Sequence, residues 1–195
     1  MKLSAQKVAE NREKVLDTAL KLFRERGFGG VSVSDLMREA GLTHGGFYNH
    51  FDSKADLEAQ ACARAFDGSS AALRAAAKPR KGGLAGYISR YLSRTWRDAA
   101  GANCPMVAFG ADVSRGAGEG AQTYAAGLRA YIDGLAALCK DSNPQEARRR
   151  AIFLASVLSG ALTLARSVRK SEPALSNEIL ATVRESLLAE LGEEA

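Results

Sequence analysis

The sequence predicts an all-α protein, and three observations support that prediction. Alanine, leucine, arginine and glutamate recur at helical spacing along almost the whole chain. Runs of β-branched residues bounded by turn signals, which would indicate strands, are missing. Only four prolines interrupt the 195 residues. A chain of this length holds one large domain or two small ones.

The first predicted helix runs from Ala5 to Arg26. A stripe of apolar side chains that includes Val15 and Leu20 follows it at helical spacing. Gly27 is expected to end this helix, because glycine readily takes the left-handed conformation found just beyond many helices.

Two short helices are predicted next. Ser32 and Asp35 form a capping box, in which each side chain binds a backbone N–H near the other, so a helix is expected from Val33 to Ala40. A tight turn containing glycine follows. Thr43 is then expected to cap a third helix over residues 44–50.

A long helix over residues 53–77 is predicted to connect two domains. Ser53 and Asp56 form the capping box that opens it. We therefore divide the chain into a domain of residues 1–52 and a second domain of residues 53–195.

The second domain is predicted to consist of further helices separated by proline or glycine. One of them carries an apolar and aromatic face of Leu84, Tyr87, Ile88, Tyr91, Leu92, Thr95 and Trp96, another begins at Asn103-Cys104-Pro105, and three more cover about 121–139, 144–169 and 173–191.

The two short helices and their turn are the pattern of a helix-turn-helix. Phe47 and Phe51 lie four residues apart and are expected to face the core. At 100° per residue, Gly45 and Asn49 then point away from it, with Tyr48 beside them. An outward face of small, polar and aromatic residues suits a helix that enters the DNA major groove.

Net charge alone does not argue for nucleic-acid binding. The chain carries +5, yet residues 1–60 hold nine basic and nine acidic side chains. Phosphates are also bound by hydroxyl groups and helix N-termini. On this basis Ser32, Thr43, Tyr48 and Lys54 are candidate phosphate contacts, and Asn49 is a candidate partner for an adenine edge.

Residues 12–58 resemble the TetR family of bacterial regulators. The resemblance implies an all-α homodimer with three DNA-binding helices and a helical ligand-binding and dimerisation domain. It also implies a repressor that a small effector releases from double-stranded DNA. The motifs that carry it are Gly27-Phe28, Val31-Ser32-Val33, Ala40-Gly41-Leu42-Thr43 and Phe47-Tyr48-Asn49-His50-Phe51-Asp52-Ser53-Lys54.

By position, the resemblance assigns roles to single residues. Tyr48 and Lys54 match the family's phosphate-gripping tyrosine and lysine. Ser34, His44, Gly45 and His50 fall where the family often reads bases or contacts adjoining phosphates. The chain departs from the pattern at Gly45-Gly46, which costs roughly 1–2 kcal/mol of helix propensity and removes two side chains that could read bases.

The aromatic residues of the second domain are candidate effector contacts. Tyr87, Tyr91, Trp96, Phe109 and Tyr124 are expected to line a ligand cavity, the alternative being ordinary core packing. No cofactor is implied.

Cys104 is a second candidate for sensing. At a helix start its pKa is expected to be lowered, which favours the reactive thiolate. Its position resembles the sensing cysteine of an electrophile-responsive TetR branch, the alternative being an inert buried thiol. Cys62 and Cys139 are expected to be structural. Three widely spaced cysteines predict neither a disulfide framework nor a metal site, and indicate a reducing cytoplasm.

Small residues on the predicted 144–169 helix allow a close helix–helix approach. With the last helix, Ser156, Ser159 and Gly160 are expected to form a four-helix dimer interface, as in the resembling family. Two symmetric recognition helices imply a near-palindromic operator. The most apolar stretch, residues 151–165, is shorter than a bilayer requires, so a buried helix is expected and no membrane partner.

Two other classes of function remain open at this point. One is a helical ligand-binding protein or enzyme with an incidental helix-turn-helix, although no catalytic or nucleotide-binding motif is recognisable, so an enzyme is not expected. The other is a DNA-binding protein without a ligand. The length of the second domain argues against it.

Overall fold

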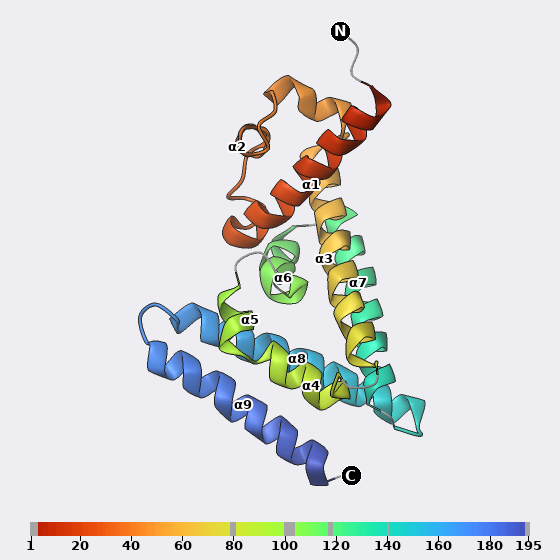
Figure 1. Ribbon diagram of the computed structural model, residues 1–195, viewed down its shortest axis with the longest axis vertical. Helices are drawn as coiled ribbons and strands as arrows, with labels where there is room; N and C mark the ends of the chain where they lie inside the picture. Colours follow the sequence, from red (N-terminus) through yellow and green to blue (C-terminus); the bar gives the residue numbers. More distant parts are fainter. Residues whose placement is uncertain (1–3, 79–80, 100–103, 117–118, 140, 194–195) are drawn as a thin grey trace.

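The computed structural model describes residues 4–78, 81–99, 104–116, 119–139 and 141–193, and within these ranges all regular structure is helical (Figure 1). The prediction of an all-α fold is confirmed. The elements in order are α1 (Ala5–Arg26), α2 (Val33–Glu39), the 3₁₀ helix η1 (His44–Asn49), α3 (Lys54–Ala76), α4 (Gly83–Tyr91), α5 (Arg94–Asp98), α6 (Pro105–Arg115), α7 (Glu119–Leu138), α8 (Pro144–Val168) and α9 (Pro173–Glu193).

The helix α1 begins and ends where the sequence predicts. The Ser4 side chain accepts a hydrogen bond from the Lys7 N–H, which caps the first turn. Gly27 follows the last turn with φ +73°, a conformation that side chains with a Cβ rarely adopt. The buried face of α1 packs on α2 and α3 through Val15, Leu16, Ala19, Leu22 and Phe23.

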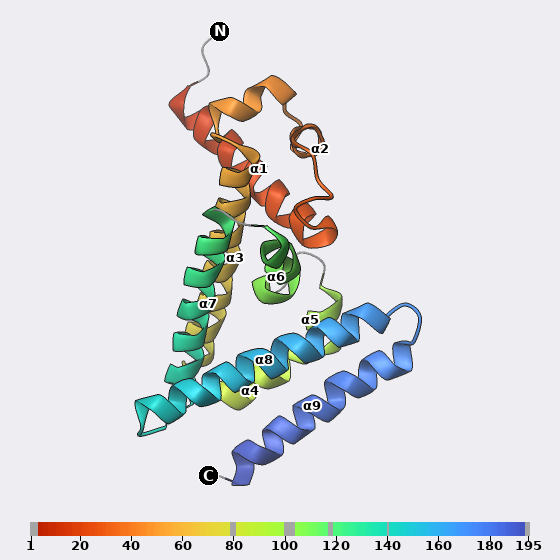
Figure 2. The same cartoon turned by 180° about the vertical axis from the view of Figure 1, so that it is seen from behind.

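The helices α3 and α7 lie side by side over most of their length (Figures 1 and 2). Two glycines of α7 make this close approach possible. A Cβ on Gly127 would lie 2.3 Å from the Phe66 ring, and one on Gly134 would lie 3.0 Å from Leu73. Larger residues at these two positions would therefore force the helices apart.

One predicted helix is broken in the structure. The aromatic face from Leu84 to Trp96 was expected to belong to a single helix, but α4 ends at Tyr91 and α5 begins at Arg94. The Ser93 hydroxyl explains the break, because it donates to the Arg90 carbonyl and accepts from the Trp96 N–H. A serine that binds the backbone in this way competes with the helix and starts a new one.

The antiparallel helices α8 and α9 form the base of the molecule, far from the N-terminus (Figures 1 and 2). A polar network joins α5 to α9 across this base. Arg97 is buried and donates to the Ser176 hydroxyl at 2.7 Å and to the Asn177 side-chain oxygen at 2.9 Å. Ser176 in turn donates to the Ala165 carbonyl of α8 at 2.6 Å.

By length and composition alone, α8 is the one helix of the described residues that could cross a membrane. Its Leu154, Leu158 and Leu162 side chains are nevertheless buried in the protein core. The core helices of globular proteins have the same composition, so α8 is a core helix with one uncovered face, as the sequence predicts.

Candidate nucleic-acid interface

The helix-turn-helix forms as predicted, and its turn is a Schellman motif. The Leu42 N–H donates to the Met37 carbonyl at 2.8 Å, and the Gly41 N–H donates to the Arg38 carbonyl at 3.0 Å. Gly41 has φ +66°, the left-handed conformation that this motif requires. The turn therefore fixes η1 at a definite angle to α2.

The third helix differs from the prediction in its type and its cap. Residues 44–49 form a 3₁₀ helix, and Thr43 makes no side-chain capping bond. Instead, the Thr43 carbonyl accepts from the Gly46 N–H at 3.0 Å. The Gly45-Gly46 pair provides the reason, because glycine weakens the longer-range α-helical pattern and short 3₁₀ segments need fewer residues to close.

This change rotates the outward face of the recognition helix. At the 120° per residue of a 3₁₀ helix, Gly45 and Tyr48 share one side, whereas the α-helical spacing paired Gly45 with Asn49. Phe47 is fully buried, as expected, and Tyr48 beside it is 67% exposed. Tyr48 is therefore the most prominent side chain of this face, and His44, Gly45 and Asn49 are exposed around it.

The start of α2 presents its own polar face. Ser32 and Ser34 are both exposed, and the predicted capping box between Ser32 and Asp35 is present. The Ser32 hydroxyl and the Arg38 guanidinium both bind the Asp35 carboxylate and lower its pKa. Arg38, whose side chain is 73% exposed, is a cation that the sequence analysis missed. Arg38 follows Ser34 by four residues, so the sequence places both side chains on one face of the helix, and this spacing could have identified Arg38.

Lys54 is in the predicted place at the start of α3, but its ammonium group is occupied. It donates to the Phe28 carbonyl at 2.7 Å and pairs with the Glu58 carboxylate at 3.2 Å. Both bonds lie within the protein, so a phosphate would have to compete with them or use the remaining proton of the ammonium group.

His50 is less accessible than the other candidate DNA contacts. The side chain is half-buried beside the Phe51 ring, and its Nδ1 atom is buried with no hydrogen-bond partner among the described residues.

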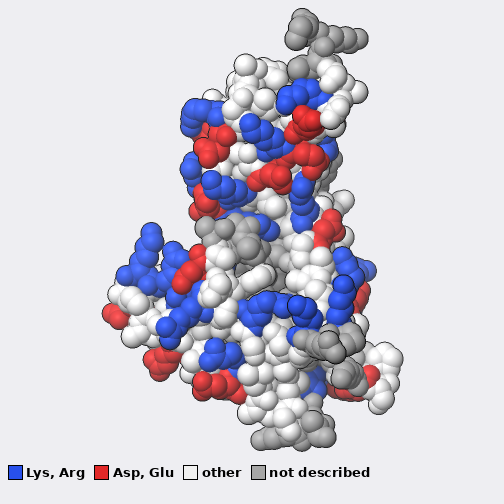
Figure 3. Space-filling model, in the orientation of Figure 1, with Lys and Arg blue, Asp and Glu red and all other residues white. Residues whose placement is uncertain are grey.

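The N-terminal domain has no continuous basic surface on the face shown in Figure 3, because acidic and basic side chains are mixed there.

A contact through Phe28 connects this domain to α6. The Phe28 N–H donates to the Asp112 carboxylate at 3.0 Å, and the Phe28 ring stacks on Phe109 at a centroid distance of 5.1 Å. Because Lys54 holds the Phe28 carbonyl, one residue joins α1, α3 and α6. Any displacement of α6 therefore acts directly on the turn that follows α1.

Most of the predicted effector-contacting aromatics lie in the core. Tyr87 and Phe109 are buried, and the Tyr87 hydroxyl forms a hydrogen bond of 2.9 Å with that of Tyr131. Tyr91 is also buried, and its hydroxyl has no hydrogen-bond partner of sound geometry among the described residues. Tyr124 is half-buried against Phe66, and burial raises its pKa to about 12.

Cys104 does not have the environment that its position predicted. It is itself the N-cap residue of α6, and Asn103 lies outside the described residues. Burial raises the pKa of the thiol, although the Tyr91 hydroxyl, two backbone N–H groups and the charge of Arg166 act in the opposite direction. The expectation of a lowered pKa is therefore wrong, because desolvation outweighs the helix N-terminus.

Among the described residues, no cluster of three or more His, Cys, Asp and Glu side chains is arranged to hold a metal ion. Together, the helix-turn-helix and the helices that follow it have the architecture of a DNA-binding regulator.

Comparison with known proteins shows what the N-terminal part of the chain is similar to. Residues 15–61 match the model of the bacterial regulatory proteins of the tetR family. AcrR of Shigella flexneri, an HTH-type transcriptional regulator, is 40% identical over 52 residues, which are 27% of this chain and 24% of AcrR. IcaR of Staphylococcus aureus, a negative regulator of the biofilm operon icaADBC, is 32% identical over 56 residues, 29% of this chain and 30% of IcaR. The aligned part thus spans less than a third of either relative.

Solved structures extend the likeness to the whole fold. The reduced form of E. coli NemR matches with a TM-score of 0.73 and 24% identity, over 90% of this chain and 96% of NemR. A TetR regulator from Chloroflexus aurantiacus matches with a TM-score of 0.75 and 20% identity, over 94% and 96%. Residues 15–61 are therefore similar to the DNA-binding domain of tetR-family regulators, and the chain has the fold of these solved regulators.

Proposed function

We propose that the chain is a cytosolic repressor that binds a near-palindromic operator as a homodimer and leaves it when a small effector binds. The observation that carries this proposal is the exposed face of η1. Tyr48 projects from it, whereas Phe47 beside it is fully buried in the domain core. A large aromatic side chain costs free energy when exposed to water, and contact with DNA would bury it.

Several groups around Tyr48 suit the DNA backbone and bases. The exposed side chains of Ser34, His44 and Asn49 lie on the same helix-turn-helix surface. Gly45 has open space where a Cβ would lie, so the backbone itself can approach a base or a phosphate closely. Arg38, which is paired with Asp35, adds an exposed guanidinium near the start of α2.

The uncovered face of α8 supports the homodimer. Phe153 and Leu164 are 51% and 58% exposed, and Ile152 lies beside them at 45%. Exposed apolar residues that line one helix commonly mark an interaction surface. The small residues Ser156 and Gly160 on the same face permit a second helix to approach closely.

The hydroxyl groups on this face are already satisfied. Ser156, Ser159 and Thr163 each donate to the carbonyl one turn earlier, at 2.9, 2.6 and 2.7 Å. A partner can therefore cover the face without leaving buried donors unpaired. A second copy of α8 and α9 would complete a four-helix bundle.

An operator-binding measurement tests the proposal. The chain should bind DNA from the region flanking its own gene with higher affinity than random DNA of equal length at physiological salt, as measured by fluorescence anisotropy. Tyr48→Ala should weaken operator binding about tenfold or more without changing the circular dichroism spectrum, because the side chain is exposed. Equal affinity for both DNAs would instead favour an incidental helix-turn-helix.

A further inference from the structure

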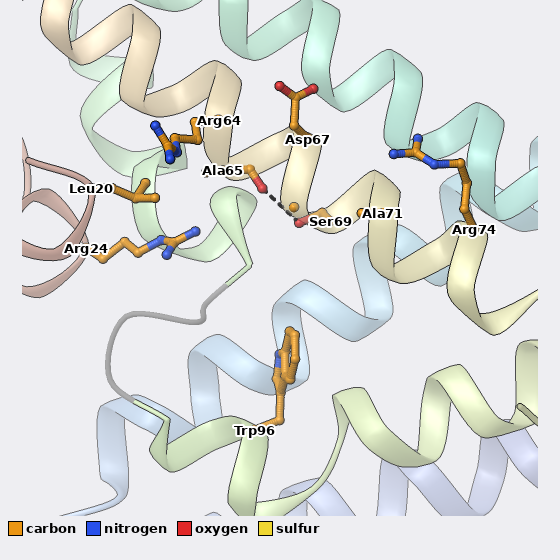
Figure 4. A pocket seen from close by; sticks show the side chains of 10 residues that line it. Leu20, Arg24, Arg64, Ala65, Asp67, Ser69, Ala71, Arg74 and Trp96 are labelled. Carbon is orange, nitrogen blue, oxygen red and sulfur yellow. Dashed lines mark hydrogen bonds between the residues drawn. The ribbon is translucent and has the colours of Figure 1, made fainter. Parts of the chain in front are cut away.

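A pocket of about 640 Å³ lies where the DNA-binding domain meets the second domain (Figure 4). One wall is the C-terminal half of α1, a second is the middle of α3, and α5 contributes the third. Its volume falls within the range of small-molecule sites. Its lining includes Leu20 and Arg24 of α1, Arg64, Asp67 and Arg74 of α3, and Trp96 of α5.

The charged side chains of the pocket favour an anion. Three arginines face a single acidic residue, Asp67. Arg64 is partly neutralised, because it pairs with Glu13 at 2.6 Å and with Asp17 at 3.1 Å. Arg24 and Arg74 contribute further positive charge to the lining.

A fourth arginine lies behind the pocket wall. Arg166 of α8 donates to the backbone carbonyls of Trp96 and Arg97 at 3.3 and 3.2 Å, which fastens α5 onto α8. Burial lowers the pKa of Arg24, and the nearby positive charge of Arg166 acts in the same direction. A negative charge placed in the pocket would be attracted to both guanidinium groups.

Trp96 adds an apolar surface and a hydrogen-bond donor. Its indole nitrogen is buried and has no hydrogen-bond partner among the described residues. In Figure 4 the indole rises from α5 into the pocket, while Arg24 reaches in from α1. A carboxylate can accept from an indole N–H and a guanidinium together, and the rest of such a ligand can pack on the ring and on Leu20.

We propose that this pocket binds a small organic acid, an apolar or aromatic body that carries a carboxylate, and that this acid is the effector of the proposed repressor. Only the role of the acid as an effector rests on the proposed function, and the binding site itself does not. The ligand would contact α1 of the DNA-binding domain directly, so its binding would favour one orientation of that domain over another. By linkage, operator DNA must weaken binding of the acid by the same factor by which the acid weakens operator binding.

The first test needs no DNA. Trp96 is the single tryptophan of the chain, so its fluorescence reports on the pocket. The probes are 4-phenylbutyrate, 4-phenylbutyramide and 4-phenylbutylamine, which share one skeleton and carry a negative, zero and positive charge. The acid should give a saturable change in fluorescence, and the amide and the amine should bind about tenfold or more weakly. No saturable change with the acid, or equal binding of the amide, would overturn the site.

Variants then locate the binding. Arg24→Gln should weaken binding of the acid about tenfold or more, since a charge-assisted hydrogen bond is lost. The matched control is Arg149→Gln, which removes a 77% exposed arginine outside the pocket lining and should leave binding unchanged. Arg74→Gln, at an exposed position of the pocket, should weaken binding about two- to threefold, and it provides the comparison if Arg24→Gln does not fold. Unchanged binding in folded variants at both positions would overturn the proposal.

The second test concerns regulation. Saturating 4-phenylbutyrate should lower operator affinity several-fold in wild type and not in Arg24→Gln. If the acid binds as expected but operator affinity stays the same, the site stands and its role as an effector site is overturned. If the chain shows no operator binding, the proposed function fails while the fluorescence result still decides the site.

Discussion

At the scale of single residues, Gly45 of η1 tests how closely the backbone approaches DNA in the proposed complex. Gly45 is exposed, and a Cβ there would meet no atom within 4 Å. The free protein therefore tolerates Gly45→Ala and gains up to about 1 kcal/mol of helix propensity. If the backbone at Gly45 touches DNA, the same methyl group should weaken operator binding about tenfold.

The control for this prediction is Gly68→Ala, because Gly68 lies in α3 outside the helix-turn-helix and also has open space where a Cβ would lie. Gly68 lines the proposed effector pocket, so the two variants are compared without effector. It should raise the free energy of unfolding and leave DNA affinity unaltered. Denaturant unfolding and anisotropy titrations measure the two effects. Stronger operator binding by Gly45→Ala would mean that helix order, and not close approach, limits the affinity.

Lys54 tests whether a lysine already bonded within the protein still contributes to DNA affinity. If its ammonium contacts phosphate, Lys54→Ala should weaken binding to operator and random DNA alike, and should reduce the salt dependence of log affinity by about one unit. Lys78→Ala removes an exposed lysine just beyond the other end of α3 and serves as the control. An unchanged salt dependence would mean that Lys54 does not contact phosphate and only bonds to Phe28 and Glu58 within the protein.

The three thiols should differ in reactivity according to their burial. Burial raises the pKa of Cys62 to about 11 and raises that of Cys104, whereas Cys139 is half-buried. Raised pKa values leave little thiolate at pH 7.5, and the thiolate is the reactive form. We expect Cys139 to react with a chromogenic disulfide first, and the other two after unfolding. Rapid labelling of Cys104, identified by peptide mass, would instead require that the region around α6 opens readily.

At the scale of elements, Phe28 is the junction between the two domains. Asp112→Ala removes the acceptor of the Phe28 N–H and should lower the free energy of unfolding by about 1–3 kcal/mol. Hydrogen exchange at the Phe28 amide should accelerate at the same time. Ser114→Ala on the same helix removes only a local bond to the Ala111 carbonyl and should change neither quantity appreciably.

Elements defined by local signals could be predicted from the sequence. The capping box at Ser32, the glycine-containing turn after α2 and the proline start of the 144–169 helix each act within a few residues, and the structure contains all three helix boundaries. The inward positions of Phe47 and Phe51 followed from helical spacing and are confirmed.

Features that depend on competition or on distant packing could not be predicted. The break at Ser93 arises because one hydroxyl replaces two backbone bonds. The environment of Cys104 depends on helices far along the chain that bury it. The pocket around Arg24 and Trp96 combines three elements, and no local pattern brings them together.

For the whole molecule, the proposed homodimer uses the uncovered face of α8. Phe153→Glu or Leu164→Glu places a charge in the proposed dimer interface and should give monomers at micromolar concentration in sedimentation experiments. Ala126→Glu, at an exposed position of α7, is the control. The monomeric variants should also lose most of their affinity for a palindrome, because two linked half-sites bind more tightly than one. A stable dimer in both variants would move the interface elsewhere.

In the proposed repressor, the uninterrupted helix α3 would act as a lever arm. At 1.5 Å per residue its 23 residues span about 34 Å, from the end of the helix-turn-helix to the vicinity of α4. A rotation of about 5° at the far end therefore displaces the tip by about 3 Å. In a dimer the two tips together would change their separation by up to about 6 Å, against a DNA repeat of about 34–36 Å. This change in the separation of the two recognition helices exceeds the length of a hydrogen bond. In the proposed dimer, a rotation too small to disturb the core would therefore still release the operator.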